Sequence, residues 1–372
     1  MKEFDNGLEK KWDYDLDAPV DSDISVEKLK GFLKPSDTLI FYGGEPLVMV
    51  EKMKEIMDNV NCRFMIQTNG LLLDKLPREY LMKLDKMLVS IDGTRNRDVE
   101  NKGAVHYDKV VSNLGGIRAK GYSGEIVARM VVSEKPDIYE QVMAILKLEL
   151  FDSVHWQIDA GFYKNDFDFK EFSEFVGEYN KSIDRLLDWW FGEIGKGEII
   201  KMYPFVGILN RVKGWDSETR LPCGAGFANF TINTNGDLSA CPIMNSVRNM
   251  YCGSMDSGVV GKKVISGCEE CGYRKICGGR CLYWREAKLW PKEGDDLICS
   301  TIKYLIDGIR SRAEEIEGAG EKAIELSHSA RIFGEKGSLE ETGAMAENSK
   351  RKRKLRKEDF EFEKYFGPEI IP

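Results

Sequence analysis

Apolar and polar positions along the first 160 residues predict strands and helices in alternation. Short apolar runs, each the length of one buried strand, precede stretches in which apolar residues recur every three or four positions. The predicted strands lie at 37–44, 63–70, 86–93, 125–133 and 153–159, and the predicted helices lie near 47–59, 77–85, 107–121 and 137–150. Because strands separated by helices are joined by right-handed crossovers, this part of the chain is predicted to form a parallel α/β sheet.

The pattern changes after residue 160. Residues 161–222 are aromatic and charged, with a helical stretch at 185–193, and residues 223–300 are rich in cysteine and poor in regular elements. A helix is predicted at 301–317, and periodicity is lost after it. Gly, Ser, Glu and Lys dominate 335–358, and they bury too little apolar surface to offset the entropy lost on ordering, so we expect that segment to be flexible.

The composition is that of a globular protein without a membrane span. Of the 372 residues, 42% are apolar and 31% are charged, and no run approaches the roughly 20 apolar residues that a membrane helix needs. The N-terminus is acidic and polar, unlike a signal peptide, so we expect a cytoplasmic protein. A net charge of −8 argues against a general nucleic-acid binder, and the basic run KRKRKLRK at 350–357 is expected to be a solvated segment.

Glycine and short polar residues stand where three of the predicted strands end. The three segments read FYGGEP at 41–46, QTNG at 67–70 and SIDG at 90–93. The carboxyl ends of parallel strands share one edge of a sheet, and ligands of α/β proteins bind at that edge. Any one of these turns could use its glycine or asparagine only to reverse the chain, but three of them together favour a shared ligand site.

Eight of the nine cysteines lie between residues 223 and 299, which points to metal binding rather than to disulfides. A pair such as Cys268 and Cys271 can hold one metal from a tight turn, and Gly278 and Gly279 keep the following loop narrow. Structural zinc sites and iron–sulfur clusters use the same thiolates, so the spacing alone leaves both possibilities open. Cys62 stands apart and is expected to be a core thiol.

Taken together, the three strand-end segments and seven spaced cysteines resemble the radical S-adenosylmethionine (radical SAM) superfamily and its SPASM extension, over residues 24–300. The resemblance implies a partial (β/α)6 barrel at 1–160 that lacks its first strand, a helical connection at 161–222 and a small Cys-rich iron–sulfur domain at 223–300. A C-terminal helical segment at 301–334 and a flexible basic tail at 335–372 complete the expected organisation.

By this resemblance the carboxyl edge of the sheet binds SAM. The methionyl ammonium would meet the FYGGEP turn, where backbone carbonyls and a carboxylate are acceptors and glycine leaves room. The implied cofactor-binding residues are Gly43, Gly44, Glu45, Pro46, Thr68, Asn69, Ser90 and Asp92. Lys102 or Arg129 would contact the SAM carboxylate, and Gln157 and Asp159 would face the pocket. Whether Asp92 bonds the ribose or the substrate stays open.

The SPASM pattern implies two auxiliary [4Fe-4S] clusters. One would be held by Cys268, Cys271, Cys277 and Cys299, and three irons of the other by Cys223, Cys241 and Cys281. Six residues before Cys223, where relatives often have a further cysteine, this chain has Ser217. The fourth iron would then be open or would be reached by Cys252, which could equally be a plain buried thiol.

One element of the family pattern is missing. Family members carry a C-x3-C-x2-C run whose thiolates hold the catalytic [4Fe-4S] cluster that cleaves SAM to a 5′-deoxyadenosyl radical, and no cysteine precedes Cys62 here. Three explanations are open: a chain that begins just past that loop through truncation or a wrongly assigned start, a degenerate homologue kept for binding, or a loop supplied by another protein. As written, the chain is expected to be inactive, with an unpaired edge on its sheet.

The sequence therefore predicts a radical SAM/SPASM iron–sulfur oxidoreductase that modifies a peptide or protein by hydrogen abstraction, provided that the native protein has the missing loop. Its cofactors would be SAM and two auxiliary clusters, with a third, catalytic cluster only if that loop is present. The implied partners are a peptide or protein substrate and an electron donor such as ferredoxin or flavodoxin. No interaction with a membrane is expected. The alternatives are a non-catalytic zinc- or iron–sulfur-bearing scaffold, or nucleic-acid binding through residues 350–357.

Overall fold

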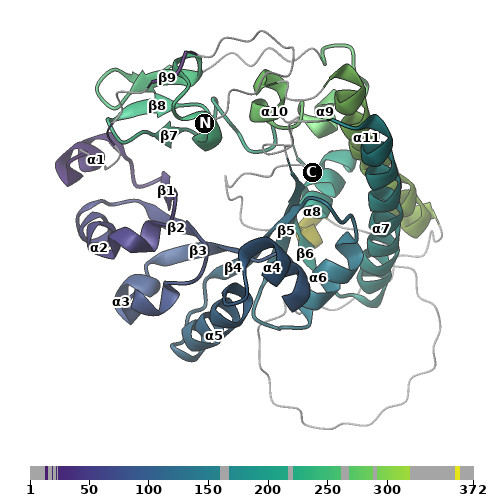
Figure 1. The fold of residues 1–372 in the computed structure, drawn as a ribbon, viewed down its shortest axis with the longest axis horizontal. Coiled ribbons are helices and arrows are strands. Elements are labelled where there is room, and N and C mark those ends of the chain that lie inside the picture. Colours follow the sequence, from purple (N-terminus) through teal and green to yellow (C-terminus); the bar gives the residue numbers. More distant parts are fainter. Residues whose placement is uncertain are drawn as a thin grey trace.

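Two sheets organise the part of the chain that the computed structural model describes, namely residues 13–15, 19, 22, 24–159, 167–216, 221–260, 268–287, 291–318 and 357–360. A six-stranded parallel sheet carries helices on its outer side, and a four-stranded antiparallel sheet lies in the cysteine-rich region (Figure 1). The parallel strands fan through a wide arc. The small sheet lies beside α1 (Val26–Phe32), near the end of the arc where β1 (Thr38–Phe41) stands.

The parallel sheet confirms the predicted α/β architecture. After β1, its strands are β2 (Arg63–Thr68), β3 (Leu84–Ser90), β4 (Glu125–Val132), β5 (Ser153–Ile158) and β6 (Lys201–Met202). They follow one another in chain order, and each neighbouring pair is parallel. All five predicted strands are present. The sequence does not predict β6, because a two-residue strand within residues 161–222 carries no periodicity.

The helices between these strands follow the prediction in part. Those that match it are α2 (Val50–Asn59), which continues the 3-10 turn η1 (Pro46–Met49), α5 (His106–Ala119) and α6 (Ile138–Leu146). The predicted helix 77–85 is shorter than expected: α3 covers only Arg78–Leu81, because β3 already begins at Leu84. The prediction lacks α1, α4 (Arg95–Lys102) and the turn η2 (Leu73–Lys75), which are short and mostly polar.

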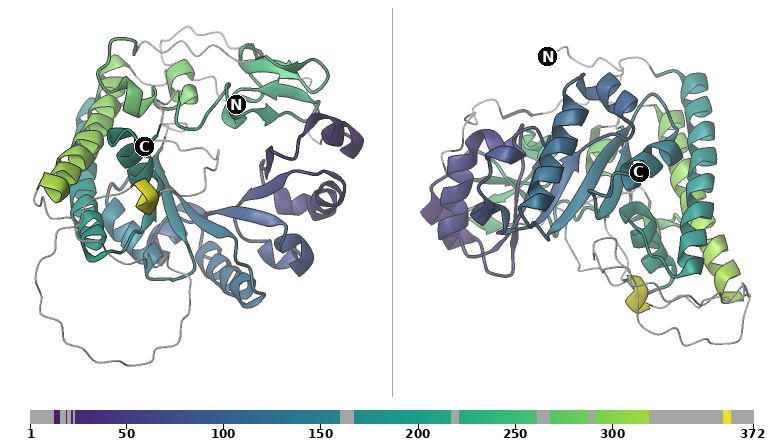
Figure 2. Two further views of the ribbon diagram at one scale, coloured as in Figure 1. Left: turned by 180° about the vertical axis from the view of Figure 1, so that it is seen from behind. Right: turned by 90° about the horizontal axis from the view of Figure 1, so that it is seen from below.

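Two long helices pack beside β5 and β6. α7 (Phe169–Lys196) contains the predicted helical stretch 185–193, and α11 (Lys292–Gly318) begins before the predicted residue 301. They run side by side (Figure 2), and Arg312 of α11 pairs with Asp184 and Asp188 of α7 at 3.1 and 2.7 Å. Phe205 of α8 (Tyr203–Val212) packs edge to face on Trp156 of β5 and Trp190 of α7, so these elements share one core.

The cysteine-rich region is more regular than predicted. Its antiparallel sheet consists of β7 (Thr231–Ile232), β8 (Asp237–Ser239), β9 (Tyr251–Ser254) and β10 (Gly258–Val259). The 3-10 turns η3 (Pro242–Met244) and η4 (Arg248–Met250) lie between β8 and β9, and the helices α9 (Arg274–Cys277) and α10 (Leu282–Ala287) follow the sheet. A separate small core that includes Leu221, Met244, Met250 and Leu282 supports these elements.

Of the C-terminal tail, the structure describes only the turn η5 (Lys357–Phe360). The segment 335–358, which is expected to be flexible, and the basic run at 350–357 therefore lie almost wholly outside the described residues. None of the helices in the described ranges is long and apolar enough to cross a membrane.

Candidate functional site

Glu45 joins the ends of β1 and β2. Its carboxylate accepts hydrogen bonds from the Thr68 hydroxyl and the Asn69 backbone N–H, both at 2.8 Å, and from the Leu47 N–H at 3.1 Å, which caps η1. The Thr68 hydroxyl in turn accepts a hydrogen bond from the Gly70 N–H at 3.0 Å. The structure thus brings the FYGGEP and QTNG segments together as one unit at the carboxyl edge of the sheet.

The glycines at this edge have two different roles. Gly70 (φ +80°) and Gly93 (φ +124°) have left-handed backbone conformations, and a Cβ added at Gly93 would come within 2.3 Å of Gln141 Oε1. These two glycines therefore serve turn geometry and close packing. By contrast, a Cβ at Gly43 or Gly44 would meet no atom within 4 Å. The FYGGEP glycines face open space, which leaves room for a ligand against their backbone.

Asp92 is buried at the end of β3, and protein groups occupy both of its carboxylate oxygens. One oxygen accepts a hydrogen bond from the Val131 N–H at 3.1 Å; the other accepts one from Asn101 Nδ2 at 3.0 Å and pairs with Lys102. Lys102 also pairs with Asp98 at 3.4 Å. Asp92 and Lys102 therefore satisfy each other, so Lys102 is not an uncommitted cation for a ligand carboxylate.

A chain of hydrogen bonds connects Asp92 to the QTNG turn. Asp98 accepts a hydrogen bond from the Asp92 N–H at 3.1 Å and contacts His106 Nδ1 at 2.6 Å, while His106 Nε2 lies 3.0 Å from the Asn69 carbonyl oxygen. Burial alone would raise the pKa of the Asp98 carboxyl, but the hydrogen bond from His106 and the charge of Lys102 bring it below its usual value. The ends of β2 and β3 are therefore fixed relative to each other.

Arg129 places a buried positive charge in the parallel sheet. It lies on β4 opposite Ser90, the last residue of β3, and only 9% of it is exposed. Its guanidinium donates to Gln157 Oε1 at 3.2 Å and contacts His155, and within the described ranges no carboxylate pairs with it. Burial lowers the pKa of Arg129 to about 10, although the charge of Tyr42 acts in the other direction. A buried cation of this kind suits an anionic ligand group.

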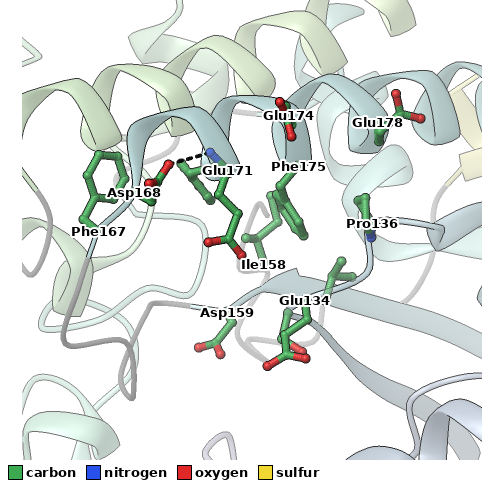
Figure 3. A pocket seen from close by; sticks show the side chains of 13 residues that line it. Glu134, Pro136, Ile158, Asp159, Phe167, Asp168, Glu171, Glu174, Phe175 and Glu178 are labelled. Carbon is green, nitrogen blue, oxygen red and sulfur yellow. Dashed lines mark hydrogen bonds between the residues drawn. The ribbon is translucent and has the colours of Figure 1, made fainter.

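A cavity of about 230 Å³ opens between the carboxyl ends of β4 and β5 and the first turns of α7. Carboxylates and phenyl rings dominate its lining: Glu134, Asp159, Asp168, Glu171, Glu174 and Glu178 with Phe167, Phe172 and Phe175. Glu171 projects from α7 toward the strand ends that carry Asp159 and Glu134 (Figure 3). Asp159 thus lines this cavity, and Gln157 is bonded to Arg129; that both face a SAM pocket stays a prediction.

Cys223, Cys241 and Cys281 form one group of neighbouring thiols, which we call the Cys281 group. Burial raises the pKa of Cys223 to about 11 and that of Cys241 to about 12, and the nearby charge of Cys281 adds to both shifts. Burial also raises the pKa of Cys281 itself. The three thiols are therefore neighbours in the fold, and burial favours their protonated form.

Cys268, Cys277 and Cys299 form a second group, which we call the Cys299 group and to which the adjoining Cys271 belongs by sequence. Burial raises the pKa of Cys277 and of Cys299; the charge of Cys299 adds to the first shift and that of Cys268 to the second. The Cys271 N–H donates to the Cys268 carbonyl at 3.1 Å, which closes a tight turn. The two groups favour the division of cysteines that the family resemblance implies.

Backbone N–H groups two or three residues further along the chain lower the pKa of several of these thiols. The pairs are Ala225 to Cys223, Ile243 and Met244 to Cys241, Gly279 and Arg280 to Cys277, and Tyr283 and Trp284 to Cys281. Such donors stabilise negatively charged sulfur, and they are a regular part of the protein surroundings of iron–sulfur clusters.

The other predicted or possible ligands lie apart. Cys252 is buried on β9, and its thiol donates to the Met250 carbonyl at 3.4 Å. Cys62 packs partly buried against the main core, as expected, and Ser217 lies outside the described residues. No three His, Cys, Asp or Glu side chains of the described residues converge closely enough to hold a metal ion. The two cysteine groups are therefore neighbourhoods of thiols rather than preassembled centres.

Two tyrosines connect the sheet edge with the Cys281 group, and the sequence does not reveal that connection. Desolvation raises the pKa of Tyr42, and the charges of Arg129 and Cys241 act on it in opposite directions. Burial raises the pKa of Tyr283, with Cys241 and Asp159 among the charges near it. Of the two tyrosines, only Tyr42 belongs to a motif, FYGGEP, that the sequence singles out. Tyr283 belongs to none. The Cys281 group thus lies near both the FYGGEP turn and the acidic cavity.

Comparisons with known proteins define the fold. No family model matches the sequence. An uncharacterized protein of Archaeoglobus fulgidus (strain ATCC 49558 / DSM 4304 / JCM 9628 / NBRC 100126 / VC-16) is 24% identical over 334 residues, covering 80% of this chain and 75% of that protein. Native anSMEcpe with bound AdoMet and Cp18Cys peptide superposes with a TM-score of 0.57 at 16% identity, over 78% of this chain and 91% of that chain. Native anSMEcpe with bound AdoMet also gives 0.57, at 15% identity over 78% and 90%. The chain therefore shares its fold with anSMEcpe.

Proposed function

We propose that this chain binds SAM at the carboxyl edge of its parallel sheet and carries two auxiliary [4Fe-4S] clusters, and that it acts in radical SAM modification of a peptide or protein only where a loop for the catalytic cluster is supplied. In this proposal residues 1–160 are a partial radical SAM barrel and 223–300 the SPASM-like domain. The observation that carries it is the hydrogen-bonded unit of Glu45, Thr68 and Asn69, with the open backbone of Gly43 and Gly44 beside it and grouped thiols nearby.

The FYGGEP turn would receive the methionyl ammonium of SAM. The Glu45 carboxylate already accepts three hydrogen bonds from the protein, which fix its position, so the carbonyl groups of Gly43 and Gly44 become the main remaining acceptors. Pro46 is the first residue of η1 and holds the backbone turn behind them. The turn thus provides a preformed acceptor site for an ammonium group.

Arg129 is the better of the two predicted contacts for the SAM carboxylate. Lys102 is committed to Asp92 and Asp98, whereas Arg129 is buried beside neutral partners. Ser90 lies opposite Arg129 across the β3–β4 pair, which places a hydroxyl-bearing residue at the same point of the edge. We therefore assign Arg129 to the ligand carboxylate and Asp92 to holding the end of β3 in place.

The cysteine groups fit iron–sulfur clusters in three respects: the thiols are grouped, they are at least partly buried, and backbone N–H groups favour the thiolate form of several. The Cys299 group with Cys271 has four ligands for one cluster, and the Cys281 group has three for the other. Bound clusters would supply one-electron transfer. Because burial raises the pKa of Cys223, Cys241, Cys277, Cys281 and Cys299, loading the clusters would release protons from these thiols.

The residues present do not fit the catalytic cluster of radical SAM enzymes, since no C-x3-C-x2-C run occurs in this sequence. We derive no step through that cluster. What the described residues can do is bind SAM, hold two clusters and accommodate a substrate at the same edge.

A peptide substrate is the proposal that the neighbouring structure supports, because anSMEcpe has been solved with the Cp18Cys peptide bound. In this chain the cavity beside Asp159 is a space at the carboxyl edge of β5, and the charges of both Asp159 and Cys241 act on Tyr283. We place the substrate there. A ferredoxin- or flavodoxin-type electron donor remains part of the proposal.

The experiment is SAM binding and iron content measured on the same anaerobically purified protein. We expect calorimetric SAM binding that Glu45→Gln and Arg129→Gln weaken at least tenfold, while Glu79→Gln, an exposed change on α3, leaves it intact. We also expect a broad visible absorption band and iron sufficient for two [4Fe-4S] clusters.

Two results would contradict the proposal. Colourless protein that contains zinc and no iron would favour the scaffold alternative. A coloured protein that does not bind SAM, or whose SAM affinity is the same in Glu45→Gln and Glu79→Gln, would remove the SAM site from the carboxyl edge while leaving the clusters in place.

A further inference from the structure

Three consecutive residues between the two cysteine groups have left-handed backbone conformations. Gly278, Gly279 and Arg280 have φ values of +69°, +95° and +68°, and they separate Cys277 from Cys281. The two glycines adopt such angles readily, but an arginine rarely does. A non-glycine residue held in this region shows that the surrounding structure requires its position.

Arg280 has two buried nitrogen atoms without a partner. Only 4% of the residue is exposed, and its Nη2 donates to Asp295 Oδ1 at 3.0 Å. Its Nε and Nη1 are fully buried and have no hydrogen-bond partner among the described residues. Buried guanidinium N–H groups are costly to leave unsatisfied, so their orphaned state points to an acceptor that the polypeptide itself does not supply.

Arg280 lies in the short loop that links the two cysteine groups, three residues after Cys277 and directly before Cys281. Burial lowers the pKa of Arg280, but the charges of Cys299, Asp295 and Cys277 outweigh burial and bring it above its usual value.

Arg285, on α10, is a second arginine beside these cysteines that has a buried nitrogen without a partner among the described residues. That nitrogen is Nε, whereas Nη1 of Arg285 donates to Cys268 Sγ at 2.9 Å. The Cys299 group thus receives a guanidinium hydrogen bond at Cys268, while the unpartnered nitrogens of Arg280 are buried in the loop that follows Cys277.

We propose that Arg280 and Arg285 donate hydrogen bonds to the sulfur atoms of the cluster on Cys268, Cys271, Cys277 and Cys299 and hold its reduction potential above that of the other cluster. The inference rests on the proposed function, since it needs the clusters. Its physical basis is that reduction adds one negative charge to a cluster, and charged donors at the sulfurs stabilise the more negative state. A cluster bound by the Cys299 group would therefore be the first of the two to be reduced.

The test is a potentiometric titration of the reconstituted full chain, with dithionite and redox mediators supplying the electrons and electron paramagnetic resonance reporting each reduced cluster. Wild type should show two clusters reduced in sequence. At the wild-type midpoint potential of the higher-potential cluster, Arg285→Gln should lower the ratio of reduced to oxidised cluster at least tenfold. For a one-electron couple this corresponds to a midpoint potential that is lower by about 59 mV. Arg280→Gln should lower the same potential and reduce the gap between the clusters.

Matched variants keep the outcome interpretable. Arg280→Lys and Arg285→Lys retain the charge but lose the fork of donors and should give intermediate potentials, so they carry the test if a glutamine variant loses its iron. Arg310→Gln removes an exposed arginine on α11 that pairs with Asp307 and should change neither potential. Iron-loaded variants with wild-type potentials would overturn the assignment of the arginines. A wild-type chain that takes up no iron would instead overturn the proposed function.

Discussion

The Glu45 carboxylate accepts a hydrogen bond from the Thr68 hydroxyl at 2.8 Å, across 23 residues of sequence, and this contact joins the first two turns of the sheet edge. Thr68→Val should lower the free energy of unfolding by about 1–3 kcal/mol, because Glu45 and the Gly70 N–H both lose a buried partner. Denaturant unfolding measures this change. Thr68→Ser keeps the hydroxyl and should be close to wild type; a loss in Thr68→Ser without a loss in Thr68→Val would mean that the methyl group, not the hydrogen bond, matters.

The two kinds of glycine at the edge should respond differently to alanine. Gly93→Ala brings a Cβ within 2.3 Å of Gln141 Oε1 at a left-handed φ and should destabilise the protein by about 1–3 kcal/mol or more. Gly44→Ala meets no atom within 4 Å and should change stability by less than about 0.5 kcal/mol. If the backbone at residue 44 binds SAM, the same change should weaken SAM binding about tenfold, or 1.4 kcal/mol. Unfolding and calorimetry on both variants separate packing from ligand contact.

Glu125 lies at the amino end of β4, opposite to the edge with the Glu45–Thr68 contact, and makes the stability of the protein depend on pH. It accepts ion pairs from Lys86 and Lys201, both at 2.7 Å, and a hydrogen bond from Tyr203 at 2.9 Å. Burial would raise the pKa of Glu125, but the two lysines lower it from the usual 4.5 to about 2. Because the folded pKa is depressed, the stabilisation is complete above about pH 4.5 and is lost as the pH falls toward 2.

Glu125→Gln should therefore lower the free energy of unfolding at neutral pH by about 3–5 kcal/mol, since it leaves the buried lysines without a carboxylate. The difference from wild type, measured by denaturant unfolding, should shrink steadily below pH 4.5. Glu140→Gln removes an exposed ion pair with Arg185 and should cost less than about 1 kcal/mol at any pH. A difference between wild type and Glu125→Gln that stayed constant down to pH 3 would contradict the depressed pKa.

The two cysteine groups predict which thiols hold iron. Cys241→Ser should remove the iron of one cluster and leave the signal of the other, because Cys241 belongs to the Cys281 group. Cys252→Ser should keep the full iron content, since that thiol is bonded to the Met250 carbonyl within the small core. Iron analysis and electron paramagnetic resonance check both. Iron loss in the Cys252 variant would make Cys252 the fourth ligand after all.

The sequence predicts the parallel sheet because each strand is a short apolar run before a helix, a pattern that local residues determine. It does not predict contacts that depend on register: Arg129 meets His155 only because β4 and β5 pair at that position. The spacing of the cysteines along the chain also does not predict which of them belong to the same group. Cys277 and Cys281 are four positions apart, yet the charge of Cys299 acts on Cys277 whereas that of Cys281 acts on Cys223 and Cys241, and only the family resemblance pointed to that division.

The strands of the parallel sheet pair in the order in which the ribosome makes them, from β1 to β6. Each strand can therefore dock on a neighbour that has already emerged, and the sheet can grow one unit at a time during synthesis. Met202, the last residue of β6, precedes Cys223, the first cysteine of either group. The sheet edge with its Glu45–Thr68 contact can thus be complete before any of these cysteines has been made, so loading of the proposed clusters would be a late and separable step of maturation.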